Sequence, residues 1–122
     1  MEKKRILVAD DDKKDSKLLE DCLLQQGYEV ILAHDGQEAL DKTMGCNPHL
    51  IVMDILLPRI NGWKVCSEIK QNPHYKHIPV VMSSSMYENY DQPNEDKAGD
   101  VYINKPVNLD LLLSTIRKLL NE

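Results

Sequence analysis

The chain has few cysteines and no long apolar run, and each shortage excludes a class of protein. It contains 3 cysteines in 122 residues, an odd number without a C-x-x-C spacing, which argues against a disulfide framework and a zinc site. No apolar stretch approaches the length of a membrane-spanning helix or of a signal-peptide core. We therefore expect a cytoplasmic chain that does not insert into a membrane.

An excess of positive charge is also missing. The 20 acidic residues outnumber the 15 basic ones and give a net charge of -5. An acidic domain is poorly suited to binding nucleic acid or an anionic membrane through its charge, so neither is an expected partner. The length predicts a single domain over residues 1–122, because half of this chain would be too short to enclose a core.

What the sequence does contain is a series of short apolar runs separated by longer amphipathic segments. Runs such as ILVA and LIVM are continuous rather than alternating, which is typical of parallel strands covered on both faces. The predicted strands are Arg5–Ala9, Glu29–Ala33, Leu50–Met53, Val80–Ser83 and Val101–Ile103.

Helical apolar spacing or capping residues mark the segments between and after these strands. The stretch between the fourth and fifth strands has no apolar stripe and contains Pro93, so a helix there is poorly specified. The alternation predicts an α/β fold with a doubly wound parallel sheet and right-handed crossovers. The predicted helices are Asp12–Gln26, Gly36–Met44, Gly62–Lys70 and Asn108–Asn121.

Polar residues follow four of the predicted strands. Asp10 and Asp11 end the first strand, Asp54 ends the third, Ser84 follows the fourth and Lys105 follows the fifth. The carboxyl ends of parallel strands share one edge, where such sheets bind ligands. Carboxylate oxygens suit Mg²⁺ or Mn²⁺, and a cation, a hydroxyl and an ammonium around one carboxylate would stabilise a phosphoryl group on it.

Each of these residues also has a structural interpretation when it is taken alone. An aspartate at a strand end can cap a helix, a serine can form a turn, and a lysine before proline can be a solvated loop charge. Their convergence on one edge of the predicted sheet favours a functional site over these separate roles.

Taken together, the motifs resemble the receiver domain of two-component response regulators, in its chemotaxis-regulator-like single-domain form. The resemblance covers nearly the whole chain and implies a flavodoxin-like five-stranded sheet of order 2-1-3-4-5 with helices on both faces. The segments that carry it are ILVADDD, GYEVILAHDGQEAL, PHLIVMDILLPRINGW, IPVVMSS and YINKP.

The resemblance implies a phosphorelay function. A histidine kinase or a histidine phosphotransfer protein would donate a phosphoryl group to Asp54 in a magnesium-dependent reaction. The modified domain would then switch a surface that contacts a downstream protein, and a phosphorylation-linked dimer is one form this could take. Apart from its own phosphorylation and slow dephosphorylation, the chain is not expected to be an enzyme.

Roles in metal binding are implied residue by residue. Asp54 matches the phosphoacceptor and a metal ligand, Asp11 the inner metal ligand, and Asp10 the outer ligand that acts through water. The backbone carbonyl of Leu56 matches a further ligand. The third aspartate of the DDD run, Asp12, is instead expected to cap the first helix.

Roles in switching are implied in the same way. Lys105 matches the lysine that pairs with the phosphoryl group, and Ser84 the hydroxyl that bonds it. Tyr102 matches the aromatic residue that swings inward on activation, although a plain edge-strand aromatic is the rival interpretation. The family more often has threonine at Ser84, so the switch would be less sharply two-state.

The chain differs from the usual family pattern at two further positions, which concern the lifetime of the phosphoryl group. Leu56 and Met86 follow Asp54 and Ser84 by two residues, at positions that flank the phosphoryl group in the family. Neither apolar side chain can orient a hydrolytic water, so slow loss of the phosphoryl group is predicted.

Other interpretations remain open at this point. The chain could be a receiver-like interaction module that does not switch, although the complete polar set argues against this. A flavin-mononucleotide protein is disfavoured because the first strand is not followed by a phosphate-binding loop rich in serine, threonine and glycine. An aspartate-based phosphatase is disfavoured because no second aspartate lies two residues after Asp54.

Overall fold

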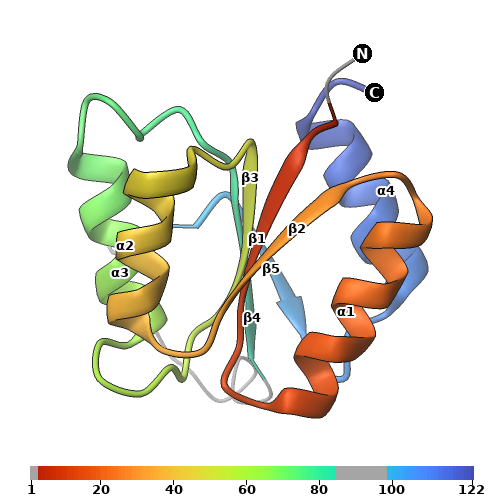
Figure 1. Ribbon diagram of the computed structural model, residues 1–122, viewed down its shortest axis with the longest axis horizontal. Helices are drawn as coiled ribbons and strands as arrows, with labels where there is room; N and C mark the ends of the chain where they lie inside the picture. Colours follow the sequence, from red (N-terminus) through yellow and green to blue (C-terminus); the bar gives the residue numbers. More distant parts are fainter. Residues whose placement is uncertain (1–2, 85–98) are drawn as a thin grey trace.

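The computed structural model describes residues 3–84 and 99–122. In this part of the chain, five parallel strands form a single sheet of order β2-β1-β3-β4-β5, which confirms the expected fold class (Figure 1). The strands are β1 (Arg5–Ala9), β2 (Glu29–Ala33), β3 (Leu50–Asp54), β4 (Val80–Ser84) and β5 (Val101–Asn104). The described helices are α1 (Lys13–Gln25), α2 (Gly36–Cys46), α3 (Gly62–Gln71) and α4 (Leu109–Leu119).

Strands β3, β4 and β5 each extend one residue further than the sequence predicted. Asp54 pairs with Ser83, and Ser84 pairs with Asn104, in the parallel ladder. The apolar pattern missed these residues because ladder hydrogen bonds are made by the backbone and do not require an apolar side chain. Consequently the polar residues of β3 and β4 are held rigidly at the end of the sheet rather than in loops.

Helix α1 begins and ends where the capping residues predict. The Asp12 carboxylate accepts hydrogen bonds from the backbone N–H groups of Lys14 and Asp15, at 2.9 and 3.0 Å, which confirms Asp12 as the N-cap. Gly27, just after the helix, has a φ of +89°, the left-handed conformation that glycine adopts most readily. The chain therefore turns sharply at both ends of α1.

The segment between β4 and β5, in which a helix is poorly specified, lies mostly outside the described residues. Met86 also lies outside them. The expectations for that helix and for Met86 are therefore left as predictions.

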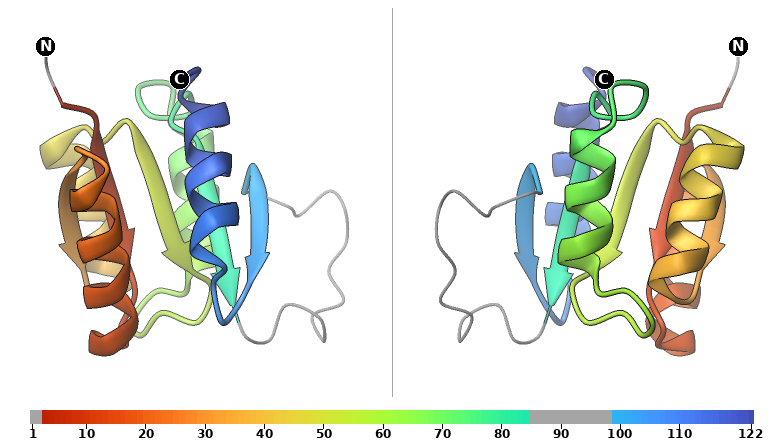
Figure 2. Two further views of the ribbon diagram at one scale, coloured as in Figure 1. Left: turned by 90° about the vertical axis from the view of Figure 1, so that its right-hand side faces the viewer. Right: turned by 90° about the vertical axis from the view of Figure 1, so that its left-hand side faces the viewer.

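The four described helices cover the two faces of the sheet in pairs. Helices α1 and α4 lie on one face, and α2 and α3 lie on the other (Figure 2). Along β1, Leu7 and Ala9 point into the core on the α2 and α3 side, whereas Ile6 and Val8 point into the core on the α1 and α4 side. This two-sided burial explains the continuous apolar runs of the sequence.

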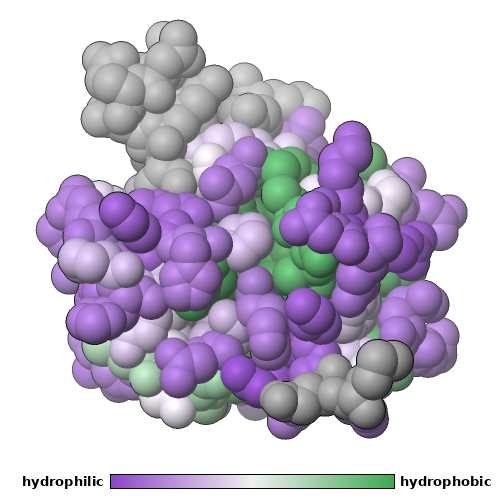
Figure 3. Space-filling model, turned by 90° about the horizontal axis from the view of Figure 1, so that it is seen from above, coloured by the Kyte–Doolittle hydropathy of each residue, from purple (hydrophilic) through white to green (hydrophobic). Residues whose placement is uncertain are grey.

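Both ends of the described chain lie at the amino end of the strands, opposite the edge that carries Asp54 (Figure 1). Hydrophilic side chains cover most of this end and surround a smaller apolar area (Figure 3). Within residues 3–84 and 99–122, no helix is long and apolar enough to cross a membrane.

Candidate functional site

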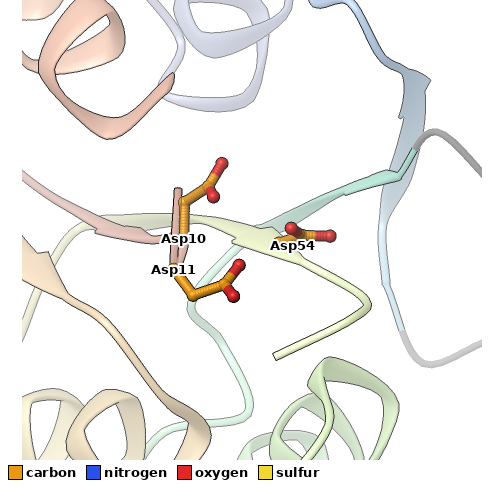
Figure 4. A group of neighbouring side chains, drawn as sticks. All are labelled: Asp10, Asp11 and Asp54. Atoms are coloured by element: carbon orange, nitrogen blue, oxygen red, sulfur yellow. The ribbon is translucent and has the colours of Figure 1, made fainter. Parts of the chain in front are cut away.

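Three aspartates meet at the carboxyl edge of the sheet. Asp10 and Asp11 follow β1, and Asp54 ends the neighbouring strand β3 (Figure 4). One carboxylate oxygen from each residue lies within 4.8 Å of the other two. Asp10 and Asp54 are buried, with 2 % and 7 % of their surface exposed, whereas Asp11 is exposed. The sequence prediction that these three residues converge is therefore confirmed.

Asp10 and Asp54 are held in the same way. One oxygen of Asp10 accepts the backbone N–H of Asp12 at 2.9 Å, and one oxygen of Asp54 accepts the backbone N–H of Leu56 at 3.1 Å. Each carboxylate thus bonds the backbone two residues further along the chain, as aspartates in turns commonly do. This bond fixes the carboxylate and leaves its second oxygen directed into the site.

Lys105 joins the two carboxylates. Its ammonium nitrogen lies 2.9 Å from Oδ2 of Asp10 and 3.0 Å from Oδ2 of Asp54, and its side chain is 15 % exposed. A third carboxylate, Asp15 in the first turn of α1, has Oδ2 at 3.5 Å from the same nitrogen. The sequence pattern does not predict this contact, because Asp15 lies 90 residues from Lys105 in the chain.

Lys105 and Asp10 both have a shifted pKa. Burial would lower the pKa of Lys105, but its hydrogen bonds to Asp10 and Asp54 outweigh that effect and raise it. Burial raises the pKa of Asp10, although its bonds to Lys105 and to the Asp12 N–H oppose the change. Lys105 is therefore firmly protonated and supplies the fixed positive charge of the site.

Helix α3 packs directly against the backbone of Asp54. The N–H of Gly62, at the start of α3, donates to the carbonyl oxygen of Ile55 at 2.7 Å. A Cβ atom at Gly62 would lie only 2.3 Å from the backbone oxygen of Asp54. Glycine is required here because any side chain would push the helix away from the strand.

The remaining predicted site residues lie near this cluster or on the strand beside it. Ser84 is buried at the end of β4, and its backbone oxygen lies 3.3 Å from the backbone nitrogen of Lys105, which donates to it. The Leu56 side chain is half exposed. Tyr102 lies in β5 with its ring 5.5 Å from that of Trp63 in α3.

The donor set suits a divalent cation. The cluster brings together three carboxylates, those of Asp10, Asp11 and Asp54, and one ammonium, that of Lys105, so acidic groups outnumber the basic one. Closely spaced carboxylate oxygens without a nitrogen or sulfur ligand fit Mg²⁺ or Mn²⁺. Such an ion would hold together carboxylates that otherwise repel one another.

Comparison with known proteins identifies the family. The family model for the response regulator receiver domain matches residues 6–117. The chain belongs to the response regulator receiver domains. This membership gives it a response-regulator role in two-component signalling, and it confirms the resemblance that the sequence motifs indicated.

Similar proteins match the receiver domain over nearly its whole length. The polar-differentiation response regulator DivK of Brucella ovis is 32 % identical over 120 residues, which cover 98 % of both chains. Protein PilG of Pseudomonas aeruginosa is 36 % identical over 114 residues, or 93 % of this chain and 84 % of that protein.

One solved structure of a similar protein is a complex with Mg²⁺-BeF. The response regulator protein TrrA of Thermotoga maritima, in complex with Mg²⁺-BeF, is 35 % identical with a TM-score of 0.85, and the match covers 95 % of this chain and 98 % of that one. The ion in this relative agrees with the chemistry of the donor set described above.

Proposed function

We propose that this receiver domain accepts a phosphoryl group on Asp54 and thereby switches a surface that binds another protein. The donor would be a histidine kinase or a histidine phosphotransfer protein, and the reaction would take place in the cytoplasm. The observation that carries the proposal is the shared ammonium of Lys105, which bonds Asp54 at 3.0 Å and Asp10 at 2.9 Å inside a group of carboxylates.

The transfer places the phosphoryl group where the positive charge is fixed. A carboxylate oxygen of Asp54 attacks the phosphorus, and the bond from phosphorus to the histidine nitrogen of the donor breaks. The electron pair of that bond stays on the nitrogen, which takes up a proton. Lys105 can follow the new oxygens because it already contacts Oδ2 of Asp54, and it offsets their charge.

A cation completes the proposed site. Asp11 and Asp54 would bind it directly, Asp10 would bind it through water, and the backbone carbonyl of Leu56 would be a further ligand. When bound, Mg²⁺ or Mn²⁺ supplies positive charge that offsets the charge of the phosphoryl group and of the carboxylates. The buried Asp10, held by the N–H of Asp12 and by Lys105, keeps its orientation whether or not the ion is bound.

The proposed switch involves Ser84 and Tyr102. The hydroxyl of Ser84 would bond a phosphoryl oxygen, which draws the end of β4 inward, and Tyr102 would move into the space that this opens. Supporting this, Ser84 is buried at the end of the strand that pairs with Asp54, and Met82 of that strand pairs with Tyr102. A downstream protein, or a second copy of the chain, would recognise the rearranged surface.

Mass spectrometry after incubation with Mg²⁺ and acetyl phosphate tests the proposal. We expect one phosphoryl group on the wild type, none on Asp54→Asn, and loss of the magnesium dependence in Asp11→Ala. The matched control is Asp12→Ala, which removes the neighbouring helix cap and should lower the melting temperature but leave phosphorylation intact. An unmodified wild type, or equal modification of Asp54→Asn, would favour an interaction module that does not switch.

A further inference from the structure

Helix α3 contacts β5 and the residues just before it at two points. At one, the Lys70 ammonium donates to Oδ2 of Asp100 at 2.7 Å. At the other, the rings of Trp63 and Tyr102 lie 5.5 Å apart at an angle of 40°. Trp63 and Lys70 are seven residues apart and share one face of α3, and Asp100, just before β5, is two residues from Tyr102 in that strand. One face of α3 therefore contacts this part of the chain at two points, through Lys70 and through Trp63.

The contact at Lys70 is a fixed anchor. Lys70 also donates to the carbonyl of Ile78 at 2.7 Å. The same oxygen of Asp100 accepts the N–H of Val80 at 2.7 Å, and the N–H of Asp100 donates to the carbonyl of Val80 at 2.9 Å. This end of β5 is tied to both α3 and β4, so it has little freedom to move.

The contact at Trp63 holds a side chain rather than the backbone. The hydroxyl oxygen of Tyr102 accepts the N–H of Gly99 at 3.0 Å. Gly99 precedes β5, so the phenol leans back along the strand, away from the edge that carries Asp54 and Ser84. Any movement of this ring toward that edge must give up the bond to Gly99 and change the contact with Trp63.

Trp63 is also next to the residue of α3 that touches the phosphoacceptor. Gly62 lies so close to the backbone of Asp54 that a Cβ atom there would be 2.3 Å from its carbonyl oxygen. The first turn of α3 thus contacts the site through Gly62 and the switch residue through Trp63.

We propose that Trp63 is a positioning residue for Tyr102, whose ring it holds in the position bonded to Gly99 and thereby opposes activation. This inference rests on the proposed function, because it assigns a regulator to the same switch. The indole contacts the Tyr102 ring in the position bonded to Gly99, so removing the indole would weaken that position. The equilibrium should then shift toward the activated position, and a phosphoryl mimic should bind more tightly by the same factor.

Beryllofluoride titration in the presence of Mg²⁺ measures this shift. Fluorine NMR of bound beryllofluoride gives the affinity in the full chain without phosphoryl transfer. Since an aromatic pair contributes modestly beyond its buried area, we expect Trp63→Leu to bind about 2- to 10-fold more tightly than the wild type. Trp63→Phe, which retains a ring, should lie between the two.

A matched control separates this effect from general loosening of the core. Tyr75 packs against the same core cluster as Trp63, and its ring is paired with His74 at 6.3 Å. Tyr75→Leu should leave the beryllofluoride affinity unchanged. Unchanged or weaker binding by Trp63→Leu, or equal tightening by Tyr75→Leu, would overturn the inference.

A second measurement does not depend on the stability of the Trp63 variants. Trp63 is the single tryptophan of the chain, so its emission should change when beryllofluoride binds to the wild type, and Tyr102→Leu should remove most of that change. If beryllofluoride binds but the emission is constant, the inference about Trp63 is wrong. If beryllofluoride does not bind at all, the proposed function itself is contradicted.

Discussion

The glycines that begin α2 and α3, and the glycine near the end of α2, give a graded test of the packing around the site. At Gly62, a Cβ atom would lie 2.3 Å from the backbone oxygen of Asp54 and 3.0 Å from Cα of Ile55. Ordinary contact begins at 3.4 Å, so helix and strand would have to separate by about 3.4 − 2.3 = 1.1 Å. Both neighbours are backbone atoms, which cannot rotate out of the way.

We expect Gly62→Ala to lower the free energy of unfolding. Overpacking of this kind typically costs about 1–3 kcal/mol, which exceeds the gain of up to about 1 kcal/mol from the higher helix propensity of alanine. Gly36→Ala should be at least as harmful, because its Cβ would lie 1.8 Å from the backbone oxygen of Ile60. Gly45, in the same helix α2 with nothing within 4 Å of its Cβ position, is the control.

Urea denaturation of the three variants measures the ranking. Gly45→Ala should be more stable than the wild type by about 0.5–1 kcal/mol, and the other two should be less stable. Gly62→Ala should also be phosphorylated by acetyl phosphate more slowly than the wild type, because the displaced carbonyl belongs to Asp54. A Gly62→Ala protein as stable as Gly45→Ala would refute the close packing of α3 on β3.

Three other outcomes are expected. Leu56→Asn should shorten the half-life of phosphorylated Asp54, measured by mass spectrometry, since an amide can orient water and leucine cannot; an unchanged half-life would contradict the prediction of slow dephosphorylation. Burial, followed by the hydrogen bond to Glu122, raises the pKa of Tyr28 to about 12. The folded state therefore keeps this proton after the unfolded chain, with a pKa of about 10, has lost it, and stability should fall between pH 10 and 12 less steeply in Tyr28→Phe. Asn108→Ala should cost about 1 kcal/mol in urea denaturation, because Asn108 caps α4 through the N–H of Leu111 at 3.0 Å, and Asn108→Asp should restore most of it.

Most of the fold could be predicted because apolar runs and capping residues are local signals. Strands β1 and β2 match the predicted bounds, and Asp12 and Asn108 cap the helices that follow them. Helix α1 shows the limit of such signals. Leu18 and Leu19 are neighbouring apolar residues of this helix, but Leu18 is 54 % exposed and Leu19 only 4 %, because successive helical residues point about 100° apart.

The convergence of the site could be predicted because parallel strands place their carboxyl ends on one edge. The sequence predicted that Asp10, Asp11 and Asp54 would lie together, and they do. It did not predict the contact of Asp15 with Lys105 or that of Trp63 with Tyr102. Both contacts join segments far apart in the chain, and their geometry depends on how a helix is rotated against the sheet, which no local pattern specifies.

Among the described residues, the sheet also divides the core into two clusters that have no buried residue in common. Trp63 and Tyr102 pack on the cluster beneath α2 and α3, whereas Leu23 and Leu112 belong to the one beneath α1 and α4. Substitutions of buried residues from different clusters act on opposite faces of the sheet, so their effects on the free energy of unfolding should add where the two sites are not in contact. The buried residues of α1 and α4 could therefore be changed to adjust the stability of this domain without touching the contact of Trp63 with Tyr102.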